Sequence, residues 1–91
     1  MSNKEELEYI PLDESQTFFT LTDLGCCGAL KVKGFELVSM DKGEPQRIKF
    51  IFRGKKGITQ TQKDYYDNNL EVPAQEYWNT IKALKNLMYG Q

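Results

Sequence analysis

Histidine is absent from this 91-residue chain, and cysteine occurs only as the adjacent pair Cys26 and Cys27. The lack of histidine removes the commonest general base, the usual partner of a serine or cysteine nucleophile, and the commonest transition-metal ligand. Adjacent cysteines cannot form an ordinary disulfide, and two thiols without histidine make a poor zinc site. We therefore expect no enzyme activity, no catalytic or metal-binding residue and no cofactor. The two cysteines are interpreted as small buried residues in a reducing compartment.

Long apolar runs are also lacking. No uninterrupted apolar stretch exceeds a few residues, whereas a membrane-spanning helix needs about 20. The chain begins Met-Ser-Asn-Lys-Glu-Glu, which lacks the apolar stretch of a signal peptide. We therefore expect no membrane contact and a cytoplasmic location.

Charge is unevenly distributed, although the net charge of the whole chain is only −1. Residues 1–30 contain one lysine against six acids, and residues 64–91 contain two lysines against four acids. Residues 31–63 contain nine lysines and arginines against three acids, which gives this stretch a net charge of +6. The middle of the chain is therefore basic and its two ends are acidic.

What the chain does contain is enough apolar surface for one domain, since 40% of its residues are hydrophobic. Residues 1–15 are polar and acidic apart from Leu7 and the apolar patch at residues 9–12, where Pro11 prevents a regular helix. We predict a flexible acidic arm over residues 1–15 and a single domain over residues 16–91. The patch suits either a plain tail or a segment that binds a partner, by folding on it or by adding a strand.

The first half of the domain predicts a strand followed by a short helix. Residues 16–21 are β-branched and aromatic, which favours a strand. The pair Thr22-Asp23 offers an N-cap with an acid in the first turn, for a helix from Asp23 to about residue 33, and Gly34 ends it. We expect Leu24, Cys27 and Leu30 to form its buried arc, with Cys26 at the edge of the arc. The helix also contains Gly25 and Gly28, which either admit a second backbone or make the helix weak.

A β-hairpin is the clearest element, with strands at residues 35–40 and 46–53 around a Gly- and Pro-containing loop. The alternation in its second strand places Ile48, Phe50 and Phe52 on the core face. The other face of that strand then carries Arg47, Lys49, Ile51 and Arg53. In the first strand, Phe35 and Leu37 are expected to face the core, and Glu36, Val38 and Met40 to face outward.

Two helices follow the basic loop at residues 54–57. Thr59 and Gln62 resemble a capping box for a short helix that carries Ile58 and Tyr65 inward. Pro73 opens the last helix. Its inward stripe is formed by Ala74, Tyr77, Ile81, Leu84 and Met88, with Trp78 at the shoulder. The order β-α-β-β-α-α predicts an α+β fold, a three-stranded, mostly antiparallel sheet with the helices packed on one face.

An open sheet face must be solvated, paired in an oligomer or used for binding. Alternate cations on the second hairpin strand continue into a Gly-Lys-Lys-Gly loop, a candidate contact for nucleic acid or another partner. The candidate residues are Arg47, Lys49, Arg53, Lys55 and Lys56. The alternative is a solvated face whose positive charge balances the acids elsewhere in the chain. We expect no exposed aromatic residue on this face, which argues against the stacking of nucleic-acid bases there. Tyr65, Tyr66 and Trp78 suit either a partner surface or the core.

Several positions together resemble a family of small uncharacterised prokaryotic and phage domains. In that family a T-D-L helix start, a short hairpin and a closing L-K-x-L-x-Tyr helix recur, and here the resemblance covers roughly residues 18–89. It is carried by Phe19, Thr22-Asp23-Leu24, Leu30, Gly34-Phe35, Leu37, Phe50, Phe52, Tyr66, Val72, Tyr77, Lys82, Leu84-Lys85 and Met88-Tyr89. Cys26 and Cys27 stand where relatives tend to have Leu-Ala. The resemblance implies a shared fold and a phage, prophage or mobile-element setting, hence host cytoplasm, and it implies no activity or catalytic residue.

The leading hypothesis is a small non-enzymatic binding or accessory protein of phage or prokaryotic origin that acts by contact with a protein partner. The alternative is a nucleic-acid-binding module that uses the basic hairpin strand and the Gly-Lys-Lys-Gly loop. Homodimerisation through the open sheet face is compatible with both. The sequence alone does not determine the identity of the partner or the order of the strands in the sheet.

Overall fold

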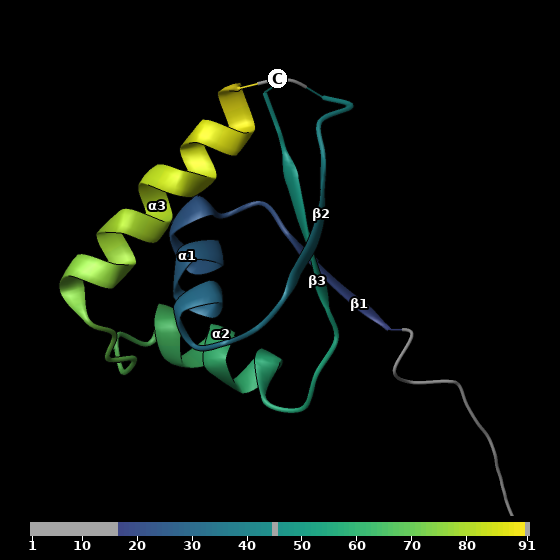
Figure 1. Cartoon of the computed structure of the whole chain (residues 1–91). Helices are drawn as coiled ribbons and strands as arrows, with labels where there is room; N and C mark the ends of the chain where they lie inside the picture. The colour runs from purple at the N-terminus through teal and green to yellow at the C-terminus, as the bar shows by residue number, and fades with distance from the viewer. Residues whose placement is uncertain (1–16, 45, 91) are drawn as a thin grey trace, which may run out of the picture.

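The computed structural model describes residues 17–44 and 46–90, and the expected arm over residues 1–15 lies outside this part of the chain. The division into an arm and a domain over residues 16–91 therefore stays a prediction. The elements are β1 (Phe18–Leu21), α1 (Leu24–Val32), β2 (Leu37–Asp41), β3 (Lys49–Arg53), α2 (Ile58–Tyr66) and α3 (Ala74–Tyr89). The predicted α+β class and the order β-α-β-β-α-α are confirmed. Figure 1 shows the three helices on one side of the sheet.

The sheet has the order β1-β3-β2, and both pairs of neighbouring strands are antiparallel. β3 is therefore the central strand. Its alternation is the one predicted from the sequence, because Phe50 and Phe52 are buried whereas Lys49 and Arg53 are exposed. Phe52 lies opposite Phe19 of β1 and Leu37 of β2, so the inward side chains of all three strands meet at the centre of the sheet.

The direction of Met40 differs from the prediction. Simple alternation from Leu37 places Met40 outside, but Met40 is partly buried and packs against the core. The cause is an irregularity of the β2–β3 register between Leu37 and Ser39, which brings Met40 opposite the buried Phe50. An extra residue in one strand shifts every later side chain to the other face. Val38 is that extra residue, and it is exposed.

The helix α1 is buried on more sides than an amphipathic helix at a surface would be. Cys26, Cys27, Ala29 and Leu30 are almost completely inaccessible, where the sequence predicted a narrower buried arc. The reason is that α1 lies between the sheet and α3, as Figure 1 shows. The helix begins one residue later than predicted, because Asp23 is its N-cap: the Asp23 carboxylate accepts a hydrogen bond from the backbone N–H of Cys26 at 3.3 Å. Gly34 follows the last turn as predicted, with a φ of +99°.

The two glycines of α1 admit side chains, not a second backbone. A Cβ atom added at Gly25 would lie 2.3 Å from the Tyr65 hydroxyl oxygen of α2, and one at Gly28 would lie 2.6 Å from Cδ1 of Ile81 in α3. The Tyr77 hydroxyl of α3 donates a hydrogen bond to the Gly25 carbonyl oxygen at 3.0 Å. The missing Cβ atoms therefore allow α2 and α3 to pack closely on α1.

The start of α2 also differs from the prediction. The N-cap is Gly57, with a φ of +94°, and it has no side chain that could cap the helix. Thr59 and Gln62 therefore do not form the predicted capping box, because the helix begins earlier, at Ile58. The Thr61 hydroxyl instead donates to the Gly57 carbonyl oxygen at 2.9 Å. A left-handed φ at Gly57 turns the chain sharply out of the preceding loop.

The long helix α3 covers α1 with the predicted stripe, apart from its first residue. Ile81 and Leu84 are buried, Tyr77 and Met88 are partly buried, and Ala74 is exposed. The Lys42 ammonium of the hairpin donates a hydrogen bond to the carbonyl oxygen of Leu87, which connects the last turn of α3 to the tip of the hairpin.

Candidate interaction surface on the open sheet face

The described helices lie on one side of the sheet and leave its other face open (Figure 1). This open face is formed by alternate residues of all three strands. Residues that lie directly opposite each other in an antiparallel sheet point to the same side. The register therefore gathers on this face the pairs Phe18 with Arg53, Thr20 with Ile51, Ser39 with Ile51, and Asp41 with Lys49. Val38, the extra residue of β2, adds a further exposed side chain.

Three apolar side chains lie on this open face. Phe18 is 53% exposed and Val38 is 38% exposed, while Ile51, in the central strand, is partly shielded. The expectation that the face carries no exposed aromatic residue is therefore wrong. The sequence analysis missed Phe18 because it predicted inward and outward side chains only for the two hairpin strands, and Phe18 belongs to β1. The signal was present in the Phe18-Phe19 pair, since in a strand only one of two adjacent phenylalanines can face the core.

The cations of the open face are accompanied by acids. Arg53 Nε lies 3.0 Å from Glu36 Oε1, and Lys49 lies opposite Asp41 in the register. Both members of the Arg53–Glu36 pair are well exposed, so the pair contributes about 1 kcal/mol or less to stability. Its main effect is to cancel charge locally. The open face is therefore less basic than the sequence of β3 alone suggests.

The five predicted contact residues do not form one site. Arg47 precedes β3 and lies beside a cleft of about 350 Å³ that also touches Met88 and Tyr89 of α3. Lys49 and Arg53 lie on the open face, and Lys55 and Lys56 belong to the loop beyond the other end of the strand. At roughly 3.3 Å per residue, Arg47 and Lys55 are separated by about 25 Å along the chain. The structure brings Lys55 and Lys56 together and leaves Arg47 at the far end.

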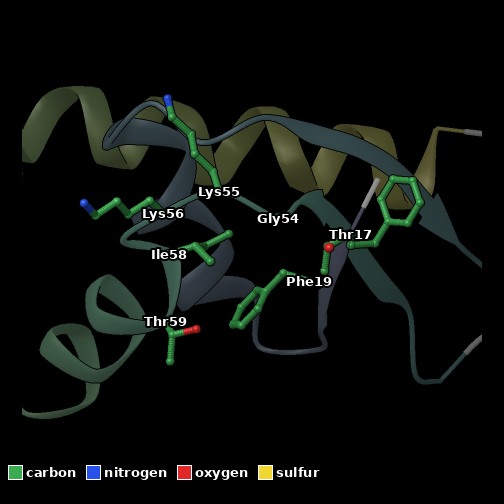
Figure 2. Close-up of a pocket in the computed structure, with 8 residues that line it drawn as sticks. Thr17, Phe19, Gly54, Lys55, Lys56, Ile58 and Thr59 are labelled. Carbon is green, nitrogen blue, oxygen red and sulfur yellow. The ribbon is translucent and has the colours of Figure 1, made fainter. Parts of the chain in front are cut away.

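A second cleft, of about 410 Å³, lies between the start of β1, the basic loop and the first turn of α2 (Figure 2). Its apolar wall includes the half-buried Phe19 and the buried Ile58, and Figure 2 shows the Phe19 ring directed toward the first turn of α2. Lys55 and Lys56 project outward at its rim. The loop closes onto β1 through a hydrogen bond from the Gly54 N–H to the Thr17 carbonyl oxygen at 2.8 Å.

The family follows from comparison of the whole chain with known proteins. Residues 16–90 match the model of a domain of unknown function, DUF5659. The chain belongs to this family. The resemblance to a small uncharacterised domain family is thereby confirmed, over a slightly longer stretch than the motifs covered. Neither the curated proteins nor the solved structures compared with it include a significant match.

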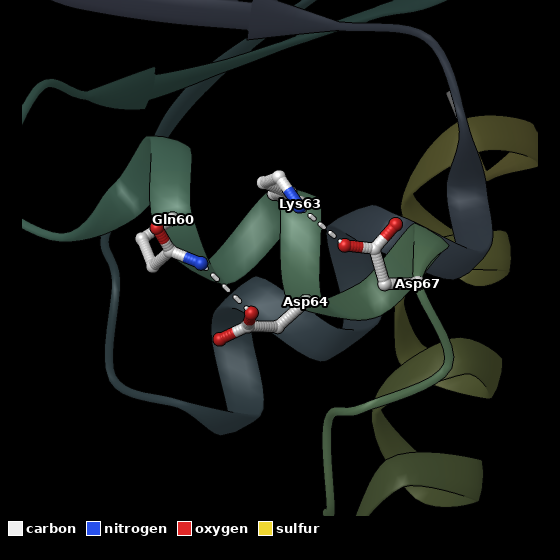
Figure 3. A network of polar contacts seen from close by, with 4 residues as sticks. All are labelled: Gln60, Lys63, Asp64 and Asp67. Atoms are coloured by element: carbon white, nitrogen blue, oxygen red, sulfur yellow. Dashed lines mark hydrogen bonds and ion pairs between the residues drawn. The ribbon is translucent and has the colours of Figure 1, made fainter.

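In this DUF5659 domain, Lys63 of the basic stretch has an acidic partner on its own helix (Figure 3). Lys63 Nζ lies 2.6 Å from Asp67 Oδ2, one helical turn further along α2. On the same helix Gln60 Nε2 donates to Asp64 Oδ1 at 2.9 Å. Such pairs at a spacing of four residues stabilise a helix by about 0.2–0.5 kcal/mol each. The presence of Lys63 in the basic stretch is thus explained by its ion pair with Asp67 within α2.

A cluster of tyrosines and cysteines joins α2 and α3 to the first turn of α1. The Tyr66 hydroxyl donates to Asp23 Oδ2 at 2.6 Å, and this hydrogen bond is the main reason why the pKa of Tyr66 is raised. Burial raises the pKa of Tyr65 to about 12, with a further contribution from its hydrogen bond to Tyr77. Burial likewise raises the pKa of the Cys26 thiol to about 11 and raises the pKa of Cys27. At neutral pH both thiols are therefore protonated, and neither is accessible.

Among residues 17–44 and 46–90, no three His, Cys, Asp or Glu side chains converge closely enough to hold a metal ion. None of the helices in that part of the chain is both long and apolar enough to cross a bilayer.

Proposed function

We propose that this chain is a small, non-enzymatic binding protein of phage or prokaryotic origin that acts through contact with a protein partner. The contact surface in this proposal is the open sheet face. The observation that supports it is the group of apolar side chains on that face, Phe18, Val38 and Ile51, which none of the described helices covers. A small domain has little apolar surface to leave in water, so an exposed phenylalanine at this position suggests an interface.

The arrangement of charges around these residues fits a protein partner better than a polyanion. The apolar side chains are bordered by the Arg53–Glu36 pair and by Lys49 opposite Asp41, so both signs of charge are present at the rim. Interfaces between proteins commonly have an apolar centre with a polar rim. Burying a phenylalanine side chain contributes about 1.5–3 kcal/mol relative to leaving it exposed.

A variant with Phe18→Ser, Val38→Thr and Ile51→Thr should lose the association by at least about tenfold, because 1.4 kcal/mol corresponds to a tenfold change in affinity. The measurement is quantitative capture by the tagged full-length chain from a lysate of the organism that encodes it. The matched control replaces Trp78 and Leu87, which have similar exposure on α3, with glutamine. Circular dichroism must show that both variants remain folded. Equal capture by the face variant and the wild type, or equal loss in the control, would contradict the proposal.

A second copy of the chain is one partner that this face could accept. A two-fold dimer uses the same patch on both subunits, and a patch that carries both signs of charge can be complementary to itself. Sedimentation at increasing concentration distinguishes this case. A monomer at high concentration would leave a different protein as the partner.

Nucleic-acid binding is the second candidate function, and two observations favour it. Lys55 and Lys56 are exposed together in one loop, and Phe18, an exposed aromatic residue suited to base stacking, lies in the same cleft. Against it, Arg53 is paired with Glu36 and Arg47 is far away. The residues that would contact nucleic acid are therefore those of the basic loop, not those of β3.

If the loop binds nucleic acid, Lys55→Glu with Lys56→Glu should weaken binding regardless of base sequence and flatten the salt dependence. Fluorescence anisotropy of labelled single-stranded RNA, single-stranded DNA and duplex DNA at two salt concentrations measures both effects. Lys82→Glu with Lys85→Glu, which reverses the same number of exposed charges on α3, is the control. No binding of any of the three probes at low salt would exclude this function.

A further inference from the structure

The cleft beside Lys55 and Lys56 has an apolar wall and a cationic rim. Phe19 and Ile58 supply the wall, and the two lysines stand at the opening (Figure 2). Its volume of about 410 Å³ falls in the range of about 300–1,000 Å³ that is typical of ligand-binding clefts. A suitable occupant has one or two large apolar side chains next to negative charge.

The chain itself contains a segment with this chemistry. Residues 9–12 read Tyr-Ile-Pro-Leu, and residues 1–16 carry five carboxylates against one lysine, a net charge of −4. The signs of charge on the segment and on the rim of the cleft are opposite, so the two attract each other.

The connection between the segment and the cleft is short. Thr17, the first described residue, is itself one of the residues that line the cleft, and its carbonyl oxygen accepts the hydrogen bond from Gly54. Residues 13–16 span at most about 14 Å, since each residue adds no more than about 3.3–3.6 Å. Their sequence, Asp-Glu-Ser-Gln, contains residues that favour turns. The patch at residues 9–12 can therefore fold back over Thr17 to the cleft.

We propose that residues 1–16 bind in cis to this cleft, with the apolar side chains of residues 9–12 against Phe19 and Ile58 and the neighbouring carboxylates beside Lys55 and Lys56. A short linker gives an effective concentration in the millimolar range, so a weak intrinsic contact is enough to populate the bound state. The docked segment places its carboxylates where a polyanion would contact the loop. It thus competes with any anionic ligand of Lys55 and Lys56. The proposal does not rest on the proposed function of the open sheet face, although Phe18 belongs to that face and also lines the cleft.

The test uses the full-length chain, enriched in ¹⁵N, and the order parameters of its backbone amides. In the wild type, the amides of Tyr9, Ile10 and Leu12 should have order parameters close to the value of about 0.85 that is typical of rigid backbone. In the variant with Lys55→Glu and Lys56→Glu they should fall below about 0.6, the range of flexible backbone. Raising the salt to about 1 M, where the Debye length is about 3 Å, should shift them in the same direction.

Exchanging the charges between the segment and the loop tests whether the loop variant acts directly on the contact. Asp13→Lys with Glu14→Lys should release the segment, and adding these two changes to the loop variant should restore the high order parameters. The matched control is Lys82→Glu with Lys85→Glu on α3, which should leave residues 9–12 unchanged. Low order parameters in the wild type, or high ones that survive the loop reversal, would overturn the proposal.

A spin label distinguishes binding within one chain from exchange between chains. A cysteine introduced by Ser2→Cys can be labelled selectively, because Cys26 and Cys27 are fully buried. Labelled chains should broaden the amide signals of Gly54, Gly57 and Thr59 in the same molecule. If broadening appears only in a mixture of labelled chains with ¹⁵N-enriched unlabelled chains, the segment occupies the cleft of a second copy and the proposal in cis is overturned.

Discussion

Replacing Phe52 with alanine is expected to lower the free energy of unfolding by about 3–5 kcal/mol. Phe52 is completely buried in the central strand, opposite Phe19 and Leu37. The surrounding strands are held by their own hydrogen bonds and can close the cavity only in part. At roughly 0.05–0.15 kcal/mol per residue, a domain of this size has a total stability of about 4–11 kcal/mol, so much of the variant should be unfolded at 37 °C.

Urea denaturation followed by circular dichroism measures this loss, and Phe18→Ala is the matched control. Phe18 is the same residue type in the neighbouring strand, but its side chain is exposed on the open face. Its replacement should cost about 1 kcal/mol or less, because little buried surface is lost. Equal destabilisation by the two substitutions would show that Phe52 does not occupy the core as described.

Replacing Gly25 with alanine is expected to destabilise the domain by about 1–3 kcal/mol, although alanine favours a helix by about 1 kcal/mol over glycine. The reason is steric, because the added Cβ would lie 2.3 Å from the Tyr65 hydroxyl oxygen and 3.3 Å from that of Tyr77. Tyr65 cannot move freely, since its side chain packs against the core. Differential scanning calorimetry or urea denaturation measures the change.

A double-mutant cycle with Tyr65→Phe tests the steric cause. Removing the hydroxyl oxygen should make Gly25→Ala less costly by about 1 kcal/mol or more, which is a typical coupling energy for residues in contact. Gly34→Ala is the control. Gly34 has a φ of +99°, but an added Cβ meets no described atom within 4 Å, so its cost should be independent of Tyr65. Additive effects of Gly25→Ala and Tyr65→Phe would contradict the proposed contact.

The elements that local patterns predicted correctly are those whose cause is local. The alternation of β3, an N-cap within the pair Thr22-Asp23 and the left-handed turn at Gly34 each depend on a few adjacent residues. The prediction of a capping box at Thr59 and Gln62 was wrong, although a capping box also depends only on adjacent residues. There Gly57 begins the helix earlier, because a glycine with positive φ allows the chain to turn out of the basic loop.

The candidate site was only partly predictable. The sequence indicated Lys55 and Lys56 as neighbours on a loop, and the structure places them beside a cleft. It did not indicate that Arg53 is paired with Glu36, because these residues lie 17 positions apart in the chain. The exposure of Phe18 was missed because it depends on which neighbour Phe19 meets across the sheet, and that neighbour is Phe52.

The sequence by itself determined the α+β class, the order of the elements and the inward face of the central strand, because periodicity and caps act within a few residues. It also determined that the chain contains no histidine and that an acidic segment precedes a basic one. Only the tertiary structure decided the strand order β1-β3-β2, the inward turn of Met40 and the burial of α1 on several sides. These features depend on pairing and packing between distant segments, and a local pattern carries no information about which distant segment will be the neighbour.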